Sequence, residues 1–166
     1  GLNSYSKLED HYNIEENGYF SGQGSHNYNQ LMGKNDLTFD DFKNLSDKWK
    51  TGSEYISLFP NVLLGVHRDH TIAVVLQPLA TDRTVERIEI YYASSNSISN
   101  KYQGMRKRNR SLWEDVFKED IFVVEGTQKG RNGIFFDGGK FSPIMDAPTH
   151  TFHHWVASNL KENNEI

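Results

Sequence analysis

The sequence predicts an α+β fold in which a curved antiparallel sheet packs against a long helix. Four strand-like segments follow one another between residues 54 and 94, separated only by short polar breaks. Such short connections indicate an antiparallel meander. The segment Ser111–Arg131 then carries apolar side chains at helical spacing. A second helical pattern near the end of the chain completes the predicted order of hairpin, meander, long helix and closing helix.

Composition limits both the class of protein and its chemistry. The 166 residues, 36% of them hydrophobic, suffice for a single domain, residues 1–166, with a sizeable core. The net charge of −4 gives no general electrostatic reason to bind nucleic acid or an anionic membrane. Because cysteine is absent, thiolate catalysis, disulfides and cysteine-ligated iron–sulfur clusters are excluded within these residues. No apolar run approaches the roughly 20 residues of a membrane span, and we expect a cytoplasmic protein.

The chain begins at Gly1 and enters directly on a polar segment. We interpret Gly1 as a residue left by tag removal, and we expect the remainder to be a piece of a longer protein.

The first part of the chain predicts a hairpin and a short helix. The segments His11–Glu16 and Tyr19–Gly24 flank Asn17 and Gly18, a strong signal for a two-residue hairpin turn. After a loop over residues 25–36, the segment Thr38–Lys48 has a capping threonine with an aspartate three residues later, which predicts a helix start. Its expected apolar face contains Phe39, Phe42, Leu45 and Trp49.

The four strands of the meander read EYISLFP (54–60), NVLLGVHRD (61–69), HTIAVVLQPLA (70–80) and TVERIEIYYAS (84–94). The last of them alternates between apolar and polar residues, with one slip near Arg87, as a half-buried strand does.

The long helix carries one carboxylate on its apolar face. At 100° per residue, that face gathers Trp113, Val116, Phe117, Asp120, Ile121, Val124 and Thr127. Burial of an unpaired carboxylate costs several kcal/mol, so Asp120 requires a cation, a metal or hydrogen-bond donors if it is buried. Alternatively, a slight rotation of the helix places Asp120 in a salt bridge or in water. As a hard oxygen ligand, it could complete an Fe(II) site together with two imidazoles.

The closing helix is expected over Pro143–Lys161, with Ser142 as its N-cap and Pro143 at the first helical position. Pro148 lies deep enough to kink this helix or to reset its start. Its expected buried stripe contains Phe152, Trp155, Val156 and Leu160.

Seven histidines offer no convincing iron site among themselves. His150 and His154 are four residues apart on a helix but enclose no glutamate of an HExxH motif. His67 and His70 bracket a turn, where polar residues are expected. The basic run of Arg106, Lys107, Arg108 and Arg110 is typical of a solvated helix face, and a docking surface is the alternative.

Three segments together resemble the catalytic domain of Rieske non-haem iron oxygenase α subunits (aromatic-ring-hydroxylating oxygenases). They read FPNVLLGVHRDHTIAVVLQPLATDRTVERIEIYYA, WEDVFKEDIFVVEGTQKGR and GGKFSPIMDAPTHTFHHWVASNL, and they span about Phe59 to Leu160. The resemblance implies a helix-grip (START/Bet v 1-like) fold and a mononuclear Fe(II) site held by two histidines and one aspartate. Asp120 matches the aspartate.

The resemblance also implies what this chain lacks. The histidine ligands would lie upstream of the hairpin, and the N-terminal [2Fe–2S] Rieske domain further upstream, so that both cofactors are expected to be absent from this fragment. The chain would then be the C-terminal part of the catalytic domain and inactive alone.

The complete oxygenase would take electrons from a reductase or ferredoxin. It would use O2 to hydroxylate an aromatic or a quaternary-ammonium substrate, as a mono- or dioxygenase and commonly as a homotrimer. Trp113, Phe117 and Val124 are the candidate substrate-lining residues. A non-catalytic helix-grip module that binds a small apolar ligand is the alternative.

Overall fold

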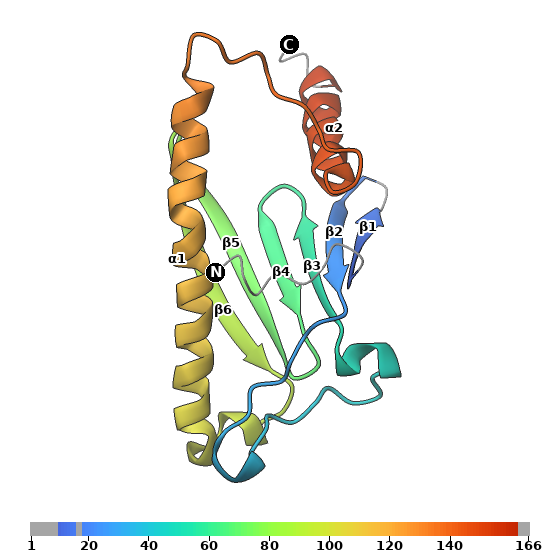
Figure 1. The fold of residues 1–166 in the computed structure, drawn as a ribbon, viewed down its shortest axis with the longest axis vertical. Coiled ribbons are helices and arrows are strands. Elements are labelled where there is room, and N and C mark those ends of the chain that lie inside the picture. Colours follow the sequence, from blue (N-terminus) through green and yellow to red (C-terminus); the bar gives the residue numbers. More distant parts are fainter. Residues whose placement is uncertain (1–9, 16–17, 163–166) are drawn as a thin grey trace.

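A single antiparallel sheet forms the centre of the computed structural model, which describes residues 10–15 and 18–162 (Figure 1). The six strands follow in sequence order across the sheet. They are β1 (His11–Glu15), β2 (Phe20–Ser25), β3 (Ser53–Leu58), β4 (Val62–Val66), β5 (His70–Ala80) and β6 (Arg83–Tyr92). The helices are α1 (Gln103–Arg131) and α2 (Ala147–Glu162), with 3-10 turns at η3 (Lys34–Asp36), η4 (Asp47–Lys50), η5 (Asn96–Ile98) and η6 (Asn100–Tyr102).

This arrangement confirms the predicted α+β fold of helix-grip type. The first hairpin pairs His11 with Ser25 and Glu15 with Ser21, as the two flanking segments predicted. Asn17, in its turn, lies outside the described residues, as does Gly1. The predicted meander is also confirmed, because each strand from β3 to β6 pairs antiparallel with the next.

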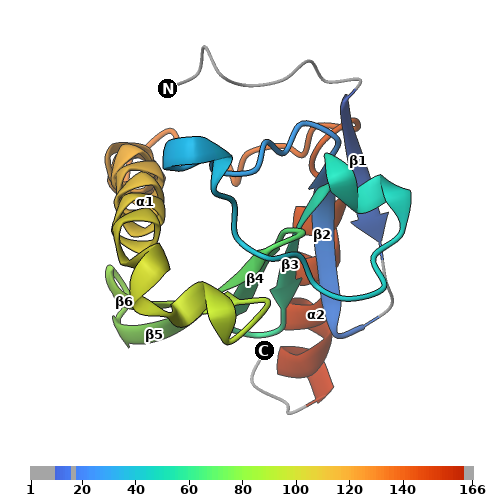
Figure 2. The ribbon, with the colours of Figure 1, turned by 90° about the horizontal axis from the view of Figure 1, so that it is seen from below.

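The two helices lie beside opposite edges of the sheet (Figures 1 and 2). The long helix α1 runs next to β5 and β6, whereas α2 contacts β1 and β2. Within the described residues, no helix combines the length and the apolar character that crossing a bilayer requires.

A cluster of buried hydrophobic residues lies at the N-terminal end of α1. Phe39, Tyr102 and Met105 are its centre, and the Phe39 ring lies 4.6 Å from the ring of Tyr92 at the end of β6. The partly buried Leu31 and Leu37 pack around them. The long helix is therefore attached to the rest of the molecule mainly by its first turns.

The helix predicted over Thr38–Lys48 is wrong, since only η4 forms at its end. Backbone N–H groups of this segment donate to distant parts of the chain instead. The Phe42 N–H donates to the carbonyl of Arg68 at 2.8 Å, and the Asp40 N–H donates to the Ser97 hydroxyl at 3.2 Å. Asn44 adopts a positive φ of 62°, which no helix interior accommodates. Tertiary contacts thus outweigh a local helical pattern here.

The closing helix starts at Ala147, not at Pro143. Pro148, now in the first turn, needs no internal N–H partner there, so the predicted reset of the start is confirmed. Ser142 is not the cap; its own N–H donates to the Asp146 carboxylate at 2.6 Å. The predicted stripe Phe152, Trp155, Val156 and Leu160 is half-buried, and the rings of Phe152 and Trp155 lie 5.1 and 5.6 Å from Phe59.

The basic run at the start of α1 is partly structural. Arg106 donates to the carbonyls of Ser97 and Ser99, and Arg108 donates to the carbonyl of Met32 at 3.1 Å. Lys107 and Arg110 face solvent, as a solvated helix face predicts. Arg106 and Arg108 therefore connect the preceding loops to the helix by hydrogen bonds.

Candidate functional site

A cavity of about 910 Å³ lies between the sheet and α1, with the start of α2 closing part of its rim. Strands β2 to β5 line one side of it, and α1 lines the other. Its volume falls within the range of pockets that hold small organic molecules. The aromatic residues of its lining are Tyr28, Tyr55, Trp113, Phe117 and Phe152.

The charge of this lining is one-sided. Asp120 and Asp146 contribute carboxylates, whereas the described lining contains no lysine or arginine. Aromatic faces and carboxylates both attract cations. The cavity therefore suits a metal ion, an organic cation or a neutral aromatic molecule better than an anion.

Asp120 projects from α1 as one of the residues that line this cavity. Trp113, Val116 and Phe117 precede it on the same helix face and also line the cavity. The side chain of Asp120 is nevertheless exposed, so it does not bear the cost of burial that the apolar stripe implied. An accessible carboxylate at a cavity wall is able to bind a metal or to accept a proton.

The three predicted substrate-lining residues divide into two groups. Trp113 and Phe117 are half-buried and line the cavity, with their ring centres 6.5 Å apart. Val124 lies one turn beyond Asp120, is 65% exposed and is not part of the described lining. The stripe on α1 therefore meets the cavity only as far as Asp120.

A buried polar cluster at the turn between β4 and β5 is the main feature that sequence reasoning missed. His67, Asp69 and His70 expose at most 2% of their surface, whereas a turn predicted accessible polar groups. His70 Nδ1 lies 2.7 Å from Asp69 Oδ1, which also accepts the Tyr28 hydroxyl at 2.9 Å. On the other side of the ring, the Trp113 indole N–H donates to His70 Nε2 at 3.1 Å.

His67 forms the centre of a ring of aromatic contacts beneath the cavity. Its imidazole stacks on His70 with ring centres 4.7 Å apart, and it contacts the cavity-lining rings of Tyr28, Tyr55 and Trp113 at 4.6, 5.7 and 5.3 Å. Burial lowers the pKa of His67 to about 3, and the neighbouring His70 adds to this effect. The ring is therefore neutral at physiological pH.

Burial and hydrogen bonding together set the ionisation of Asp69 and Tyr28. Burial opposes the charge on Asp69, but the hydrogen bonds from His70 and Tyr28 outweigh it and hold the pKa of Asp69 below its usual range. Burial and the nearby Asp69 charge raise the pKa of Tyr28. Tyr28 thus keeps its proton as a donor. Within the described residues, His67 Nδ1 and Asp69 Oδ2 are buried without a hydrogen-bond partner.

Strand parity was the signal that could have located His70. His70, Ile72 and Val74 alternate along β5 and are all buried, so His70 begins the inward-facing series of that strand. Ile72 and Val74 mark this parity in the sequence, although Val75 on the opposite face is apolar as well. The burial of His67 and Asp69 depends on Tyr28 and Trp113, which come from distant parts of the chain.

The histidines of α2 do not gather further ligands. His150 packs its ring against Phe141, with ring centres 5.1 Å apart, and His154 is exposed. Across residues 10–15 and 18–162, no three His, Asp or Glu side chains lie close enough together to hold a metal ion.

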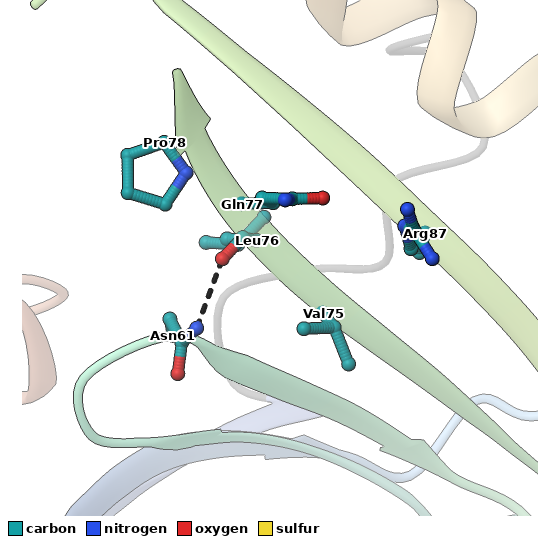
Figure 3. Close-up of a pocket in the computed structure, with 6 residues that line it drawn as sticks. All are labelled: Asn61, Val75, Leu76, Gln77, Pro78 and Arg87. Carbon is teal, nitrogen blue, oxygen red and sulfur yellow. Dashed lines mark hydrogen bonds between the residues drawn. The ribbon is translucent and has the colours of Figure 1, made fainter. Parts of the chain in front are cut away.

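A second, shallower hollow of about 310 Å³ involves β5 and β6 (Figure 3). Asn61 donates to the carbonyl of Leu76 at 2.9 Å at its edge, and among the described lining residues Arg87 alone is charged. It offers no set of converging reactive groups, and the larger cavity is therefore the candidate site.

Comparison with known proteins connects this chain to one family. The family model described as ring hydroxylating alpha subunit (catalytic domain) matches residues 2–162. No curated protein matches the chain.

Proposed function

We propose a catalytic role in a Rieske-type oxygenase for this chain, which belongs to the family of ring hydroxylating alpha subunits (catalytic domain). In this proposal the chain is the C-terminal part of the catalytic domain. The complete α subunit uses mononuclear Fe(II) and O2 to hydroxylate an aromatic or quaternary-ammonium substrate, as a mono- or dioxygenase.

The position of Asp120 on the cavity wall carries the proposal. A carboxylate oxygen is a suitable ligand for Fe(II) in a site of two histidines and one carboxylate, and Asp120 points such a group at the cavity. The bound iron would supply the activation of O2. In this proposal the two histidines lie in a segment upstream of this chain, as the resemblance to Rieske oxygenases implies.

The other residues of this chain act on the substrate. Trp113 and Phe117 form an apolar wall on the same helix face as Asp120, where they would orient the substrate and exclude water from the reacting group. The lining without lysine or arginine supports a neutral aromatic or a cationic substrate over an anionic one.

The proposed enzyme is cytoplasmic and depends on partners. A reductase or ferredoxin would deliver electrons to a [2Fe–2S] cluster in an N-terminal Rieske domain, and the full-length protein would form a homotrimer. The chain alone would therefore be inactive toward any substrate, and turnover by the isolated chain with a reductase would contradict the assignment of the missing ligands.

Iron reconstitution of the intact α subunit tests the role of Asp120. We expect one mononuclear iron per subunit in the parent protein, beyond the iron of the cluster, and loss of that iron in Asp120→Ala. Asp115→Ala is the matched control, because Asp115 is an exposed carboxylate on another face of the same helix. Retention of the mononuclear iron in Asp120→Ala would reject Asp120 as a ligand.

A non-catalytic helix-grip module is the second candidate, since the same cavity could hold a small apolar ligand without a metal. Metal content separates the two. An Asp120-dependent iron site excludes a purely binding role, whereas tight binding of an apolar ligand by an iron-free intact protein favours it.

A further inference from the structure

Two aromatic residues of the cavity lining, Tyr28 and Trp113, lie at opposite ends of one buried chain of hydrogen bonds. The Tyr28 hydroxyl donates to Asp69 Oδ1 at 2.9 Å, and His70 Nδ1 lies 2.7 Å from the same oxygen. The Trp113 indole N–H then donates to His70 Nε2 at 3.1 Å. A loop, a strand turn and the long helix thus meet at one aspartate–histidine pair.

The chemistry of the indole fixes the state of His70. An indole N–H can only donate, so His70 Nε2 must carry a lone pair, and the ring proton must sit on Nδ1. That proton points at Asp69. An ionised carboxylate is an acceptor and has no hydrogen to donate. Asp69 therefore selects the one neutral tautomer of His70 that is able to accept from Trp113.

Packing alone does not explain why a polar pair occupies this buried position. Asp69 and His70 are 0% and 2% exposed, and burial of a carboxylate and an imidazole costs free energy that an apolar pair of similar volume would avoid. The polar pair provides directional contacts. A hydrogen bond restricts the rotation of the Trp113 and Tyr28 rings more than an apolar contact would.

We propose that Asp69 and His70 are positioning residues that set the orientation of the Trp113 and Tyr28 rings and thereby the shape of the cavity beside Asp120. Trp113 precedes Asp120 by about two helical turns on the cavity face. A shift of its indole would therefore alter the wall along which a substrate reaches Asp120. The effect on substrate selection rests on the proposed function, whereas the effect on ring orientation does not.

Solvent exchange of the indole N–H tests the orientation directly in the 15N-labelled chain. In His70→Leu, which lacks an acceptor, we expect the Trp113 N–H to exchange roughly fivefold faster or more, the size of one hydrogen bond. In His70→Gln, whose side-chain oxygen can accept near the position of Nε2, we expect exchange close to that of the parent. The indoles of Trp49 and Trp155 serve as internal references, and unchanged Trp113 exchange in His70→Leu would overturn the proposal.

The imidazole nitrogen shifts test the part played by Asp69. In Asp69→Asn the amide can donate to Nδ1, so we expect the proton of His70 to move to Nε2 and the Trp113 hydrogen bond to be lost. If the His70 proton stays on Nδ1 in Asp69→Asn and the Trp113 hydrogen bond is intact, Asp69 does not select the tautomer of His70.

Kinetics of the intact oxygenase test the effect on substrate. Trp113→Phe keeps an aromatic ring but has no N–H, so Trp113→Phe and His70→Leu should each raise KM roughly fivefold with a smaller change in kcat. The double variant should be no worse than either single variant, because both break the same bond. His154→Leu, at an exposed position on α2, is the control.

The outcomes separate the two proposals. Additive effects, or an unchanged KM in a folded Trp113→Phe, would overturn a role in shaping the cavity. If His70→Leu does not fold, Trp113→Phe still decides, since it leaves Asp69 and His70 in place. Absence of turnover and of mononuclear iron in the parent enzyme would reject the proposed function, while the exchange measurement would still decide whether the pair orients Trp113.

Discussion

The two halves of α1 have the same helical geometry but different surroundings. Up to Trp113, the helix buries Met105 and Asn109 and forms hydrogen bonds to β5 and β6 through Trp113 and Asn109. Beyond Asp120, four consecutive apolar residues are exposed, with Phe122 at 84% and Val124 at 65%. Helical periodicity alone therefore does not reveal where a helix is packed.

The exposed half also differs in how its apolar side chains are distributed. Ile121, Phe122, Val123 and Val124 are adjacent in sequence, so they point in different directions around the helix. A helix that is apolar all round is normally enclosed, whereas the first half is apolar on one face and packs on one side. The comparison predicts that substitutions in the first half lower the free energy of unfolding of this chain strongly, and that those in the second half change it little.

The largest contrast is expected between two phenylalanines. Phe39→Ala removes a ring that is 2% exposed and packs on the start of α1, and it should lower the free energy of unfolding by about 3–4 kcal/mol. Phe122→Ala, at a site that is 84% exposed, should change it by less than about 0.5 kcal/mol. Urea unfolding followed by circular dichroism measures both, and equal losses would show that the two halves of α1 are packed alike.

An intermediate effect is expected from His67, which packs under Trp113 where the anchored half of α1 ends. Because burial lowers its folded-state pKa to about 3, the unfolded chain binds more protons below pH 6.5. Stability should therefore fall as the pH drops from about 6.5 toward 3. We expect a loss of about 2 kcal/mol between pH 7 and pH 5.

Urea unfolding at these two pH values measures that loss, and His67→Phe, which cannot be protonated, should reduce it. Asp69 contributes in the same direction at lower pH, since its lowered pKa gives stability that is lost as the pH falls through the acidic range. A pH profile that His67→Phe leaves unchanged would assign the loss to other groups.

Within the packed half of α1, the smallest effect is expected from Asn109, whose side-chain amide donates to the Tyr92 hydroxyl at 3.3 Å. Asn109→Ala should cost about 1 kcal/mol, the net worth of one hydrogen bond with its desolvated partner left behind. Tyr92→Phe removes the same bond from the other side. A double variant that loses no more than the larger single loss would place both effects in this one contact.

Local patterns predicted most of the fold. Short polar breaks located β3 to β6 within a few residues, alternation supported β6, and β5 begins and ends at the predicted His70 and Ala80. The first hairpin and the end of α1 at Arg131 also follow from local patterns, although α1 begins eight residues before the predicted Ser111. These elements are predictable because neighbouring residues determine them and the tertiary contacts agree with the local preference.

The segment Thr38–Lys48 shows where such prediction stops. Its phenylalanines are spaced for a helix, but Phe39 is inserted into the core, and the backbone of Phe42 bonds to Arg68 instead. The contacts that outweigh the local pattern come from residues distant in the sequence. The start of α2 was predicted less sharply, because Pro143 and Pro148 each offered a valid helix start, and the structure uses the second.

The candidate site was predicted in part. The sequence identified α1 as the element that carries it, with Asp120, Trp113 and Phe117 on one face, and all three line the cavity. The sequence did not reveal that Val124 lies beyond the lining, because periodicity states which residues share a face but not how far the neighbouring sheet extends along it. Whether Asp120 binds iron stays a prediction.

The sequence by itself determined the order of strands and helices, the face of α1 on which Asp120 lies, and the motifs that connect the chain to its family. Only the tertiary structure decided which part of that face is packed, and that His67, Asp69 and His70 form a buried support beneath the cavity. The physical reason is range: periodicity arises from neighbours along the chain, whereas burial and tautomer depend on partners such as Tyr28 and Trp113, which only folding brings together.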